Sequence, residues 1–279
     1  MSPLALADTP KDTLVIAKSI DDMITLDPAE AYEFTGIEVI ANMYDRIMRL
    51  EPTDINKLVP GVAESYTVSD DGKTFTFKIR PGQKFASGNP VTAADAAFSL
   101  QRVIKLDKTP AFLIGQLGWT KDNVDQMVKV VDPMTLQITI TEDFSPSLVL
   151  SLMSSVVGSV VDMKTAMEHE TAGDFGYAWL KTNSAGSGAY TLKAWKANES
   201  VSLEMNPNYR SGAAALKRVV IRHVTEPAAQ RLLIEKGDVD IARDLTPDQV
   251  AGVTSNTDIT ITTIPQARLY YVGLILKTT

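Results

Sequence analysis

The chain has 279 residues, of which 44% are hydrophobic and 22% are charged, and its formal net charge is −7 at pH 7. This is the composition of a globular protein with a sizeable core, and the length favours one large domain or two lobes. The acidic balance gives no attraction for phosphate backbones, so nucleic acid is not an expected partner. The absence of cysteine excludes disulfides, thiolate chemistry and Cys-ligated zinc or iron–sulfur clusters.

The N-terminal residues MSPLALADTP contain Ala5-Leu6-Ala7 before Asp8. This small-x-small pattern is the kind that signal peptidase reads, although a basic n-region and a longer apolar stretch are missing. We interpret residues 1–7 as the remnant of an export signal, and a flexible leader is the alternative. The sequence contains no run of about 18 apolar residues, so no membrane-spanning helix is expected.

The first half of the chain predicts a strand, two helices and a hairpin. Residues 13–18 (TLVIAK) form an apolar run typical of a strand, and apolar residues from Gly36 to Leu50 recur at helical spacing. Residues 65–68 and 74–79 flank the turn Ser69-Asp70-Asp71-Gly72, which predicts a β-hairpin. Thr92 followed by Asp95 resembles a capping box at the start of a second helix.

The second half alternates strands and helices without regular βαβ order, which indicates a mixed α/β (α+β) fold. The predicted elements are a hairpin in VKVVDPMTLQITI with its turn at Asp132-Pro133, paired strands in AYTLKAWK and VSLEMN, a strand in LKRVVIRHV, a helix over 226–236 that Gly237 ends, a strand in DVDIA, a short helix in TPDQVAGV, and strands in ITITTIP and LYYVGLIL.

No motif carries catalytic or metal-binding chemistry. His169 is expected on a solvated helical face and His223 on a sheet surface, and neither has a partner at metal-ligand spacing. SDDGKTF lacks the ligand spacing of a calcium loop, and GSGAY lacks the context of a P-loop, a dinucleotide fingerprint or a nucleophile elbow. We therefore expect no enzyme, no cofactor and no bound metal.

Several stretches resemble the family 5 extracellular solute-binding proteins, the dipeptide/oligopeptide-binding receptors of ABC importers. The strongest is LVPGVAESYTVSDDGKTFTFKIRPGQKFASGNPVTAADAAFSLQRV, which is similar to the signature block of that family. Three further stretches match in family order: NMYDRIMRLEP, GSGAYTLKAWKANESVSLEMNPNYRSG and LLIEKGDVDIARDLTPDQV. The resemblance runs from about Thr13 to Leu276.

The resemblance implies the first lobe of a two-lobed, periplasmic-binding-protein type II clamp, built from two subdomains. Residues 8–38 plus 183–279 would form the core subdomain, and residues 39–182 an inserted one. Family members continue beyond the crossover strand that LYYVGLILKTT resembles, so we expect a truncated chain in which lobe II is absent. A naturally minimal variant is the alternative.

The implied function is the periplasmic substrate-binding component of an ABC importer, with a peptide as the expected solute class and a membrane permease as the expected partner. The alternatives are a non-peptide solute (an opine, a nickel chelate, an oligosaccharide or a polyamine-like cation) or, much less favoured, an enzyme that uses this fold. A monomer is expected for the full-length receptor.

In peptide-binding family members the acidic residue that holds the peptide ammonium lies in the second lobe, so no residue here inherits that role. The first-lobe wall would come from the loop after the first strand, from the segment Tyr32 to Phe34, from the glycine turn at Gly186 to Gly188, and from the crossover strand. The candidate ligand-binding residues are Asp21, Asp22, Met23, Glu33, Phe34, Ser187 and Tyr270. The loop Leu113 to Trp119 is a further candidate for the rim, and a core position is the alternative for Trp119. Extended backbone can pair with a peptide, aromatic side chains supply apolar area, and carboxylates favour an ammonium group. An ordinary solvated loop is the alternative for Asp21 and Asp22, and a charge near a helix N-terminus is the alternative for Glu33.

Overall fold

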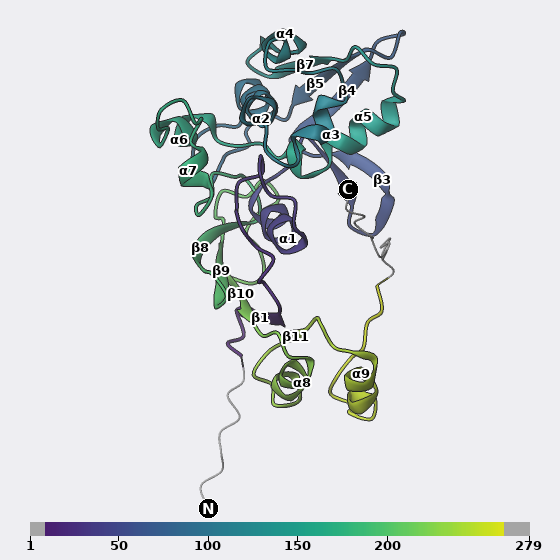
Figure 1. Cartoon of the computed structure of the whole chain (residues 1–279), viewed down its shortest axis with the longest axis vertical. Helices are drawn as coiled ribbons and strands as arrows, with labels where there is room; N and C mark the ends of the chain where they lie inside the picture. The colour runs from purple at the N-terminus through teal and green to yellow at the C-terminus, as the bar shows by residue number, and fades with distance from the viewer. Residues whose placement is uncertain (1–8, 265–279) are drawn as a thin grey trace, which may run out of the picture.

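The structure is a computed structural model that describes residues 9–264. Within this range the strands form a five-stranded sheet of order β11-β1-β10-β9-β8, a four-stranded sheet of order β4-β5-β7-β6, and a β2-β3 pair. The five-stranded sheet lies in the lower half of Figure 1, and the four-stranded sheet lies near the top.

The five-stranded sheet has β1 as a central strand. Its strands are β1 (Thr13–Lys18), β8 (Tyr190–Lys196), β9 (Ser200–Met205), β10 (Arg218–His223) and β11 (Ile241–Ala242). Strand β1 pairs in parallel with both β10 and β11, whereas β10, β9 and β8 run antiparallel. Successive β1 side chains point to opposite faces. Ile16 therefore joins the main core, while Val15 and Ala17 join a small cluster with residues next to and within α8 (Pro227–Glu235).

The chain between β1 and β8 contains the strands of the other two sheets and most of the helices. The strands between β1 and β8 are β2 (Met48–Glu51), β3 (Asp54–Pro60), β4 (Ala63–Val68), β5 (Thr74–Ile79), β6 (Val128–Asp132) and β7 (Thr135–Thr139). The helices are α1 (Phe34–Met43), α2 (Ala93–Leu106), α3 (Ala111–Gly115), α4 (Val124–Met127), α5 (Pro146–Met153), the 3-10 helix η1 (Val156–Gly158), α6 (Met163–Glu168), α7 (Tyr177–Leu180) and, near the C-terminal end, α9 (Pro247–Val253).

The predicted local structure of the signature block is confirmed. Strands β4 and β5 form the hairpin, and Gly72 adopts a φ of +69° in its turn, a value that glycine reaches without a Cβ penalty. Thr92 and Asp95 form a reciprocal capping box at the start of α2. The alternation in β5 places Phe75, Phe77 and Ile79 in the core.

The helix predicted from Gly36 to Leu50 is wrong in its second half. Helix α1 ends at Met43, and Tyr44 is extended, with φ −123° and ψ 128°. The chain then pairs with a distant segment: Ile47 N–H donates to Gly158 (2.9 Å), and Val160 N–H donates to Asp45 (2.9 Å). Both Ile47 and Met48 are buried. Their apolar side chains satisfied the helical spacing, but the backbone partners that decide the conformation are more than a hundred residues away.

Two predictions near the C-terminal end are also corrected. Only Ile241 and Ala242 of DVDIA form a strand, and the described part of ITITTIP, residues 259–264, is not assigned to one. Ile261 and Ile264 are 45% and 69% exposed. A strand requires a neighbour for its ladder, and no described strand pairs with this segment. The predicted strand LYYVGLIL, Tyr270 and residues 1–7 lie outside the described residues.

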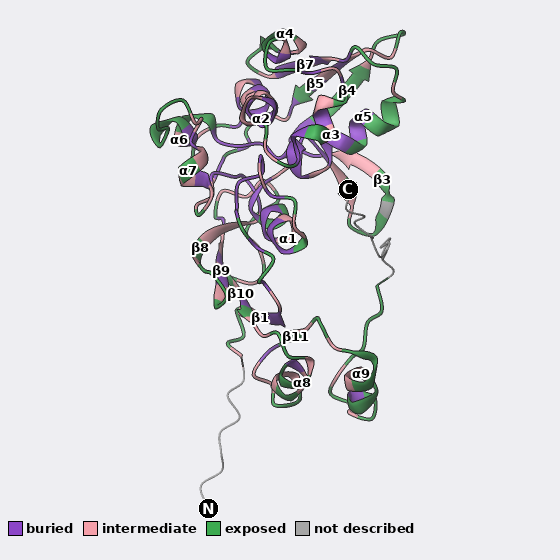
Figure 2. Cartoon of the chain, viewed as in Figure 1, coloured by how far each residue is buried: buried purple, intermediate pink, exposed green. Residues whose placement is uncertain are grey.

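One hydrophobic cluster connects the two larger sheets. It contains Ile16 from β1, Val39 and Ile40 from α1, and Phe75 and Phe77 from β5. Figure 2 shows buried residues concentrated in α1 and α2, whereas α8 and α9 are mostly exposed or intermediate. Within the described residues, the larger of the two hydrophobic clusters therefore includes side chains from both larger sheets.

Candidate functional site

The loop between β1 and α1 is held in shape by acidic side chains that accept hydrogen bonds from the backbone. Asp22 Oδ2 accepts from Thr35 N–H (3.1 Å), in the first turn of α1. Glu33 Oε1 accepts from Ile24 N–H (3.1 Å), and Glu33 Oε2 accepts from Tyr32 N–H (2.8 Å). The N-cap residue of α1, Glu33, makes no capping bond itself, so Asp22 supplies it from the preceding loop.

This loop exposes apolar side chains instead of burying them. Ile24, Tyr32 and Phe34 are 62%, 47% and 70% exposed, and Phe112 of α3 is 56% exposed. The Tyr32 and Phe112 rings meet edge to face, with centroids 5.6 Å apart and an interplanar angle of 80°. A cluster of exposed large apolar side chains is a typical mark of a binding surface. We call Ile24, Tyr32, Phe34 and Phe112 the apolar wall.

Asp21 lies in the same loop and is exposed. Ser19 Oγ donates to its Oδ1 (2.6 Å). That hydrogen bond is the main reason why the pKa of Asp21 lies below its ordinary value. Asp21 is thus an ionised carboxylate in open solvent at neutral pH, which is the form that attracts a cationic group.

The base of the loop is fixed to the five-stranded sheet. Ser19 N–H donates to Asp244 Oδ2 (2.7 Å), and Ile20 N–H donates to His223 Nδ1 (3.1 Å). Just before the loop, the Lys18 ammonium pairs with Glu38 of α1 (2.8 Å). These contacts leave the segment little freedom before it reaches the apolar wall.

Two of the other candidates from the sequence, Met23 and Ser187, are buried in the interior. Met23 is 6% exposed and belongs to the main core. Ser187 is 2% exposed, and its Oγ donates to Asp45 Oδ2 (3.3 Å), a carboxyl whose pKa is raised by burial. Tyr270 is outside the described residues. The structure therefore brings Asp22, Glu33 and Phe34 to the apolar wall, whereas Met23 and Ser187 lie in the interior.

Ser187 belongs to a close backbone crossing. A Cβ at Gly186 would lie 2.0 Å from the carbonyl oxygen of Met43, and one at Gly188 would lie 2.5 Å from that of Asn42. Gly188 N–H donates to Met43 (2.9 Å) and Ala86 N–H donates to Gly186 (3.0 Å). The glycines of GSGAY permit the turn to pass directly against the end of α1.

Sequence reasoning missed Ile24 and Phe112 as members of the wall. The segment containing Tyr32 and Phe34 was recognised, but Phe112 is 80 positions further along than Tyr32. No periodicity relates the two, so only the tertiary contact between their rings could identify the pair.

His169 has a structural neighbour that the sequence did not indicate. Its ring stacks on Trp179, with centroids 4.2 Å apart.

In the part of the chain that the structure describes, no group of three or more His, Cys, Asp or Glu side chains is arranged to hold a metal ion. Within the same part, no helix has the length and apolar character to span a membrane.

A family model and a curated relative both match this chain to bacterial binding proteins. The family model described as "Bacterial extracellular solute-binding proteins, family 5 Middle" matches residues 57–278. The chain is 32% identical over 276 residues to the probable D,D-dipeptide-binding periplasmic protein DdpA of Escherichia coli (strain K12), covering 98% of this chain and 51% of that protein.

Two solved structures extend the comparison. The Escherichia coli murein tripeptide binding protein MppA superposes with a TM-score of 0.73 at 26% identity, covering 89% of this chain and 49% of that one. MoaA from A. tumefaciens R10, in complex with mannopinic acid, superposes with a TM-score of 0.77 at 26% identity, covering 92% and 50%.

The mixed α/β architecture corresponds to one lobe of a two-lobed binding protein. This confirms the fold expected from the sequence. The chain belongs to the bacterial extracellular solute-binding proteins of family 5. It spans about half the length of the relatives that it matches, and those relatives are binding proteins.

Proposed function

We propose that this chain supplies one wall of the solute site in a periplasmic receptor of an ABC importer, and that the solute is a short peptide. The permease of such an importer is the expected partner, and the receptor acts without a cofactor and without catalysis. The proposal is supported by the names of two relatives, one a probable D,D-dipeptide-binding protein and the other a murein tripeptide binding protein.

The observation that carries the proposal is the apolar wall beside an acidic loop. Ile24, Tyr32, Phe34 and Phe112 expose apolar area, which favours the side chains of a peptide without requiring one sequence. Asp21 places an ionised carboxylate in the same loop, and an ammonium group would pair with it through a charge-assisted hydrogen bond.

We also propose the two-subdomain division, with residues 8–38 plus 183–279 as the core subdomain and residues 39–182 as the inserted one. Support comes from the sheets: the five-stranded sheet is built from β1 and β8 to β11, and the four-stranded sheet from β4 to β7. The apolar wall lies where these parts meet, because Tyr32 comes from the first and Phe112 from the second.

A second candidate is a non-peptide solute that also carries a charged group. The relative MoaA is in complex with mannopinic acid, so this fold accommodates ligands other than peptides. The exposed wall and the acidic loop would suit an amphipathic cation equally well. A binding measurement therefore distinguishes a peptide solute from a non-peptide solute, since the same fold accepts both classes.

The test is a binding screen by amide chemical-shift titration of the isotope-labelled chain. Di- and tripeptides with free N-termini should shift the resonances of Ile24, Tyr32 and Phe112. The same peptides with acetylated N-termini should bind more weakly, because the ammonium group is lost. Shifts at the wall with mannopinic acid, polyamines or a nickel chelate, and none with peptides, would contradict the peptide proposal.

A further inference from the structure

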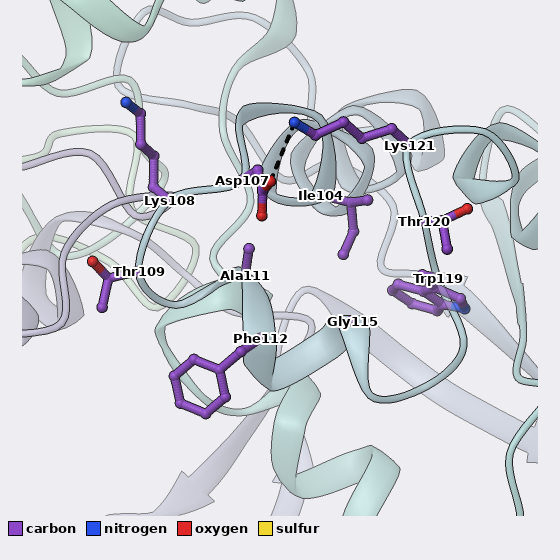
Figure 3. Close-up of a pocket in the computed structure, with 10 residues that line it drawn as sticks. All are labelled: Ile104, Asp107, Lys108, Thr109, Ala111, Phe112, Gly115, Trp119, Thr120 and Lys121. Atoms are coloured by element: carbon purple, nitrogen blue, oxygen red, sulfur yellow. Dashed lines mark ion pairs between the residues drawn. The ribbon is translucent and has the colours of Figure 1, made fainter. Parts of the chain in front are cut away.

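An open groove lies between the C-terminal end of α2 and helix α3. Its volume is about 610 Å³, and it is lined by Ile104, Asp107, Lys108, Thr109, Ala111, Phe112, Gly115, Trp119, Thr120 and Lys121. Figure 3 shows the ring of Phe112 and the indole of Trp119 on opposite sides of Gly115. Grooves of roughly 300–1,000 Å³ are the usual size for small-molecule sites.

The base of the groove is formed by buried apolar side chains. Ile104, Ala111 and Trp119 are 5%, 5% and 3% exposed. The indole N–H of Trp119 donates to Thr139 (2.7 Å), so its hydrogen-bonding capacity is already used within the chain. The accessible apolar surface comes mainly from the Phe112 ring, which is 56% exposed, so an apolar side chain that enters the groove would pack on this ring.

The rim of the groove is polar and carries one Asp and two Lys side chains. The Lys121 ammonium pairs with Asp107 (3.2 Å), and both side chains are more than half exposed. The Lys108 ammonium lies over the Tyr177 ring, 4.7 Å from its centroid. The rim therefore suits the hydrated, polar backbone of a ligand and gives no strong preference for a separate ion.

Phe112 connects the groove to the apolar wall. The same ring lines the groove and contacts Tyr32 of the loop between β1 and α1. A peptide on the wall would thus have the groove within reach of one side chain. Gly115 leaves the groove open, because a Cβ at that position would meet only Ile104 Cδ1, at 4.0 Å.

We infer that the groove between α2 and α3 is a subsite for one aliphatic or aromatic side chain of the bound peptide, and that it makes the receptor favour peptides with a bulky apolar residue. This inference rests on the proposed peptide function. It adds a specificity-determining position, Gly115, whose missing side chain creates the space.

The test compares two substitutions at Gly115. Gly115→Leu fills the groove, whereas Gly115→Ala adds one methyl group and serves as the matched control. Gly115 ends a helix and has no positive φ, so both residues are compatible with its backbone. The probes are trialanine and its variants with a single Leu or Phe at each position, titrated against the isotope-labelled chain by amide chemical shifts.

For the parent chain, Leu or Phe at one peptide position should bind about tenfold more tightly than Ala, as burial of such a side chain implies. The shifts that distinguish this peptide from trialanine should fall at Ile104, Gly115 and Trp119. Gly115→Leu should remove the preference for Leu or Phe over Ala, and Gly115→Ala should keep most of it.

Two results would overturn the inference. If the parent binds peptides without a preference, or if Gly115→Leu retains the full preference, the groove is not a subsite although the peptide function stands. If no peptide in the series binds at the wall, the proposed function fails and the subsite fails with it.

Discussion

Asp27 and Arg102 form a buried, two-pronged ion pair that joins the N-terminal loop to helix α2. Arg102 Nη1 lies 2.6 Å from Asp27 Oδ1, and Nη2 lies 2.5 Å from Oδ2, with both side chains at most 1% exposed. Arg102 Nε donates to Phe175 (2.9 Å), and Ala29 N–H donates to Asp27 Oδ1 (2.9 Å). The pair fixes the loop that carries Tyr32 against the part of the chain that carries Phe112.

Removal of one partner of this pair should be severely destabilising. Arg102→Met leaves the Asp27 carboxylate buried without its cation, and we expect the free energy of unfolding to fall by about 3–5 kcal/mol. The double variant Asp27→Asn/Arg102→Met should recover part of the loss, because no unpaired charge stays buried. Urea denaturation gives both values. Lys196→Ala, in the exposed pair with Glu199 (2.9 Å), should cost less than about 1 kcal/mol and is the control.

The aromatic residues of the apolar wall should matter for binding more than for folding. Tyr32→Ala and Phe112→Ala should each make the free energy of peptide binding less favourable by about 1 kcal/mol or more. Both side chains are about half exposed, so the melting temperature should change little. Leu232→Ala on α8, also 50% exposed, is the control for loss of an exposed apolar side chain. If both wall variants bind the peptide with unchanged affinity, the apolar wall is not part of the binding site.

Asp22 should have separable roles in stability and in solute binding. Asp22→Asn keeps an oxygen for Thr35 N–H but removes the charge, so a cationic solute should bind more weakly while the melting temperature stays nearly unchanged. Asp22→Ala also removes the cap of α1 and should cost about 1 kcal/mol of stability. Titration and thermal denaturation measure the two effects. If the Asp22→Asn variant binds a cationic peptide as tightly as the parent chain does, the charge of Asp22 plays no part in recognition.

The glycine turn beside α1 should tolerate no side chain. A Cβ at Gly186 would lie 2.0 Å from the Met43 carbonyl oxygen, which is backbone and has little room to move. Gly186→Ala should therefore lower the free energy of unfolding by at least about 2 kcal/mol, as overpacked sites do. Gly115→Ala, which enters open space, should be neutral or slightly stabilising. If Gly186→Ala is as stable as the parent, the glycine turn and the end of α1 can move apart to accommodate a methyl group.

Stability should fall in acid partly through Asp162. Burial acts to raise the pKa of this carboxyl, but hydrogen bonds from Ser87, Thr165 and Asn89 outweigh burial and bring the pKa below the ordinary 3.8. Ionised Asp162 therefore stabilises the fold above about pH 3.8, and this contribution is lost as the pH falls through the lower folded pKa. Burial raises the pKa of nearby Asp95, so that group acts in the opposite direction and stabilises the fold more at low pH.

The pH prediction is checked by urea unfolding of the parent and of Asp162→Asn at pH 6 and pH 3. The parent should lose more stability between the two values than the variant does. Asp122→Asn, at an exposed position, should follow the parent. An identical loss in Asp162→Asn and in the parent would show that Asp162 does not contribute to the acid sensitivity.

The features that depend on neighbouring residues along the chain could be predicted from local sequence patterns. The hairpin around Gly72 requires a turn residue with positive φ between two alternating strands, and the capping box joins Thr92 to Asp95 within one turn. The order of such stretches also identified the family. Each of these features is complete within a few residues, so composition and spacing record it.

The features that depend on distant partners could not be predicted from local patterns, because they follow from tertiary packing. Helix α1 ends at Met43 because the following backbone pairs with residues near Gly158. The pair Asp27–Arg102 joins positions 75 residues apart, and the wall forms where Tyr32 meets Phe112. An apolar or charged residue looks the same in a sequence whether it is buried, paired or exposed. Its role is set by which surface the fold brings opposite it, and that is a property of packing and not of local pattern.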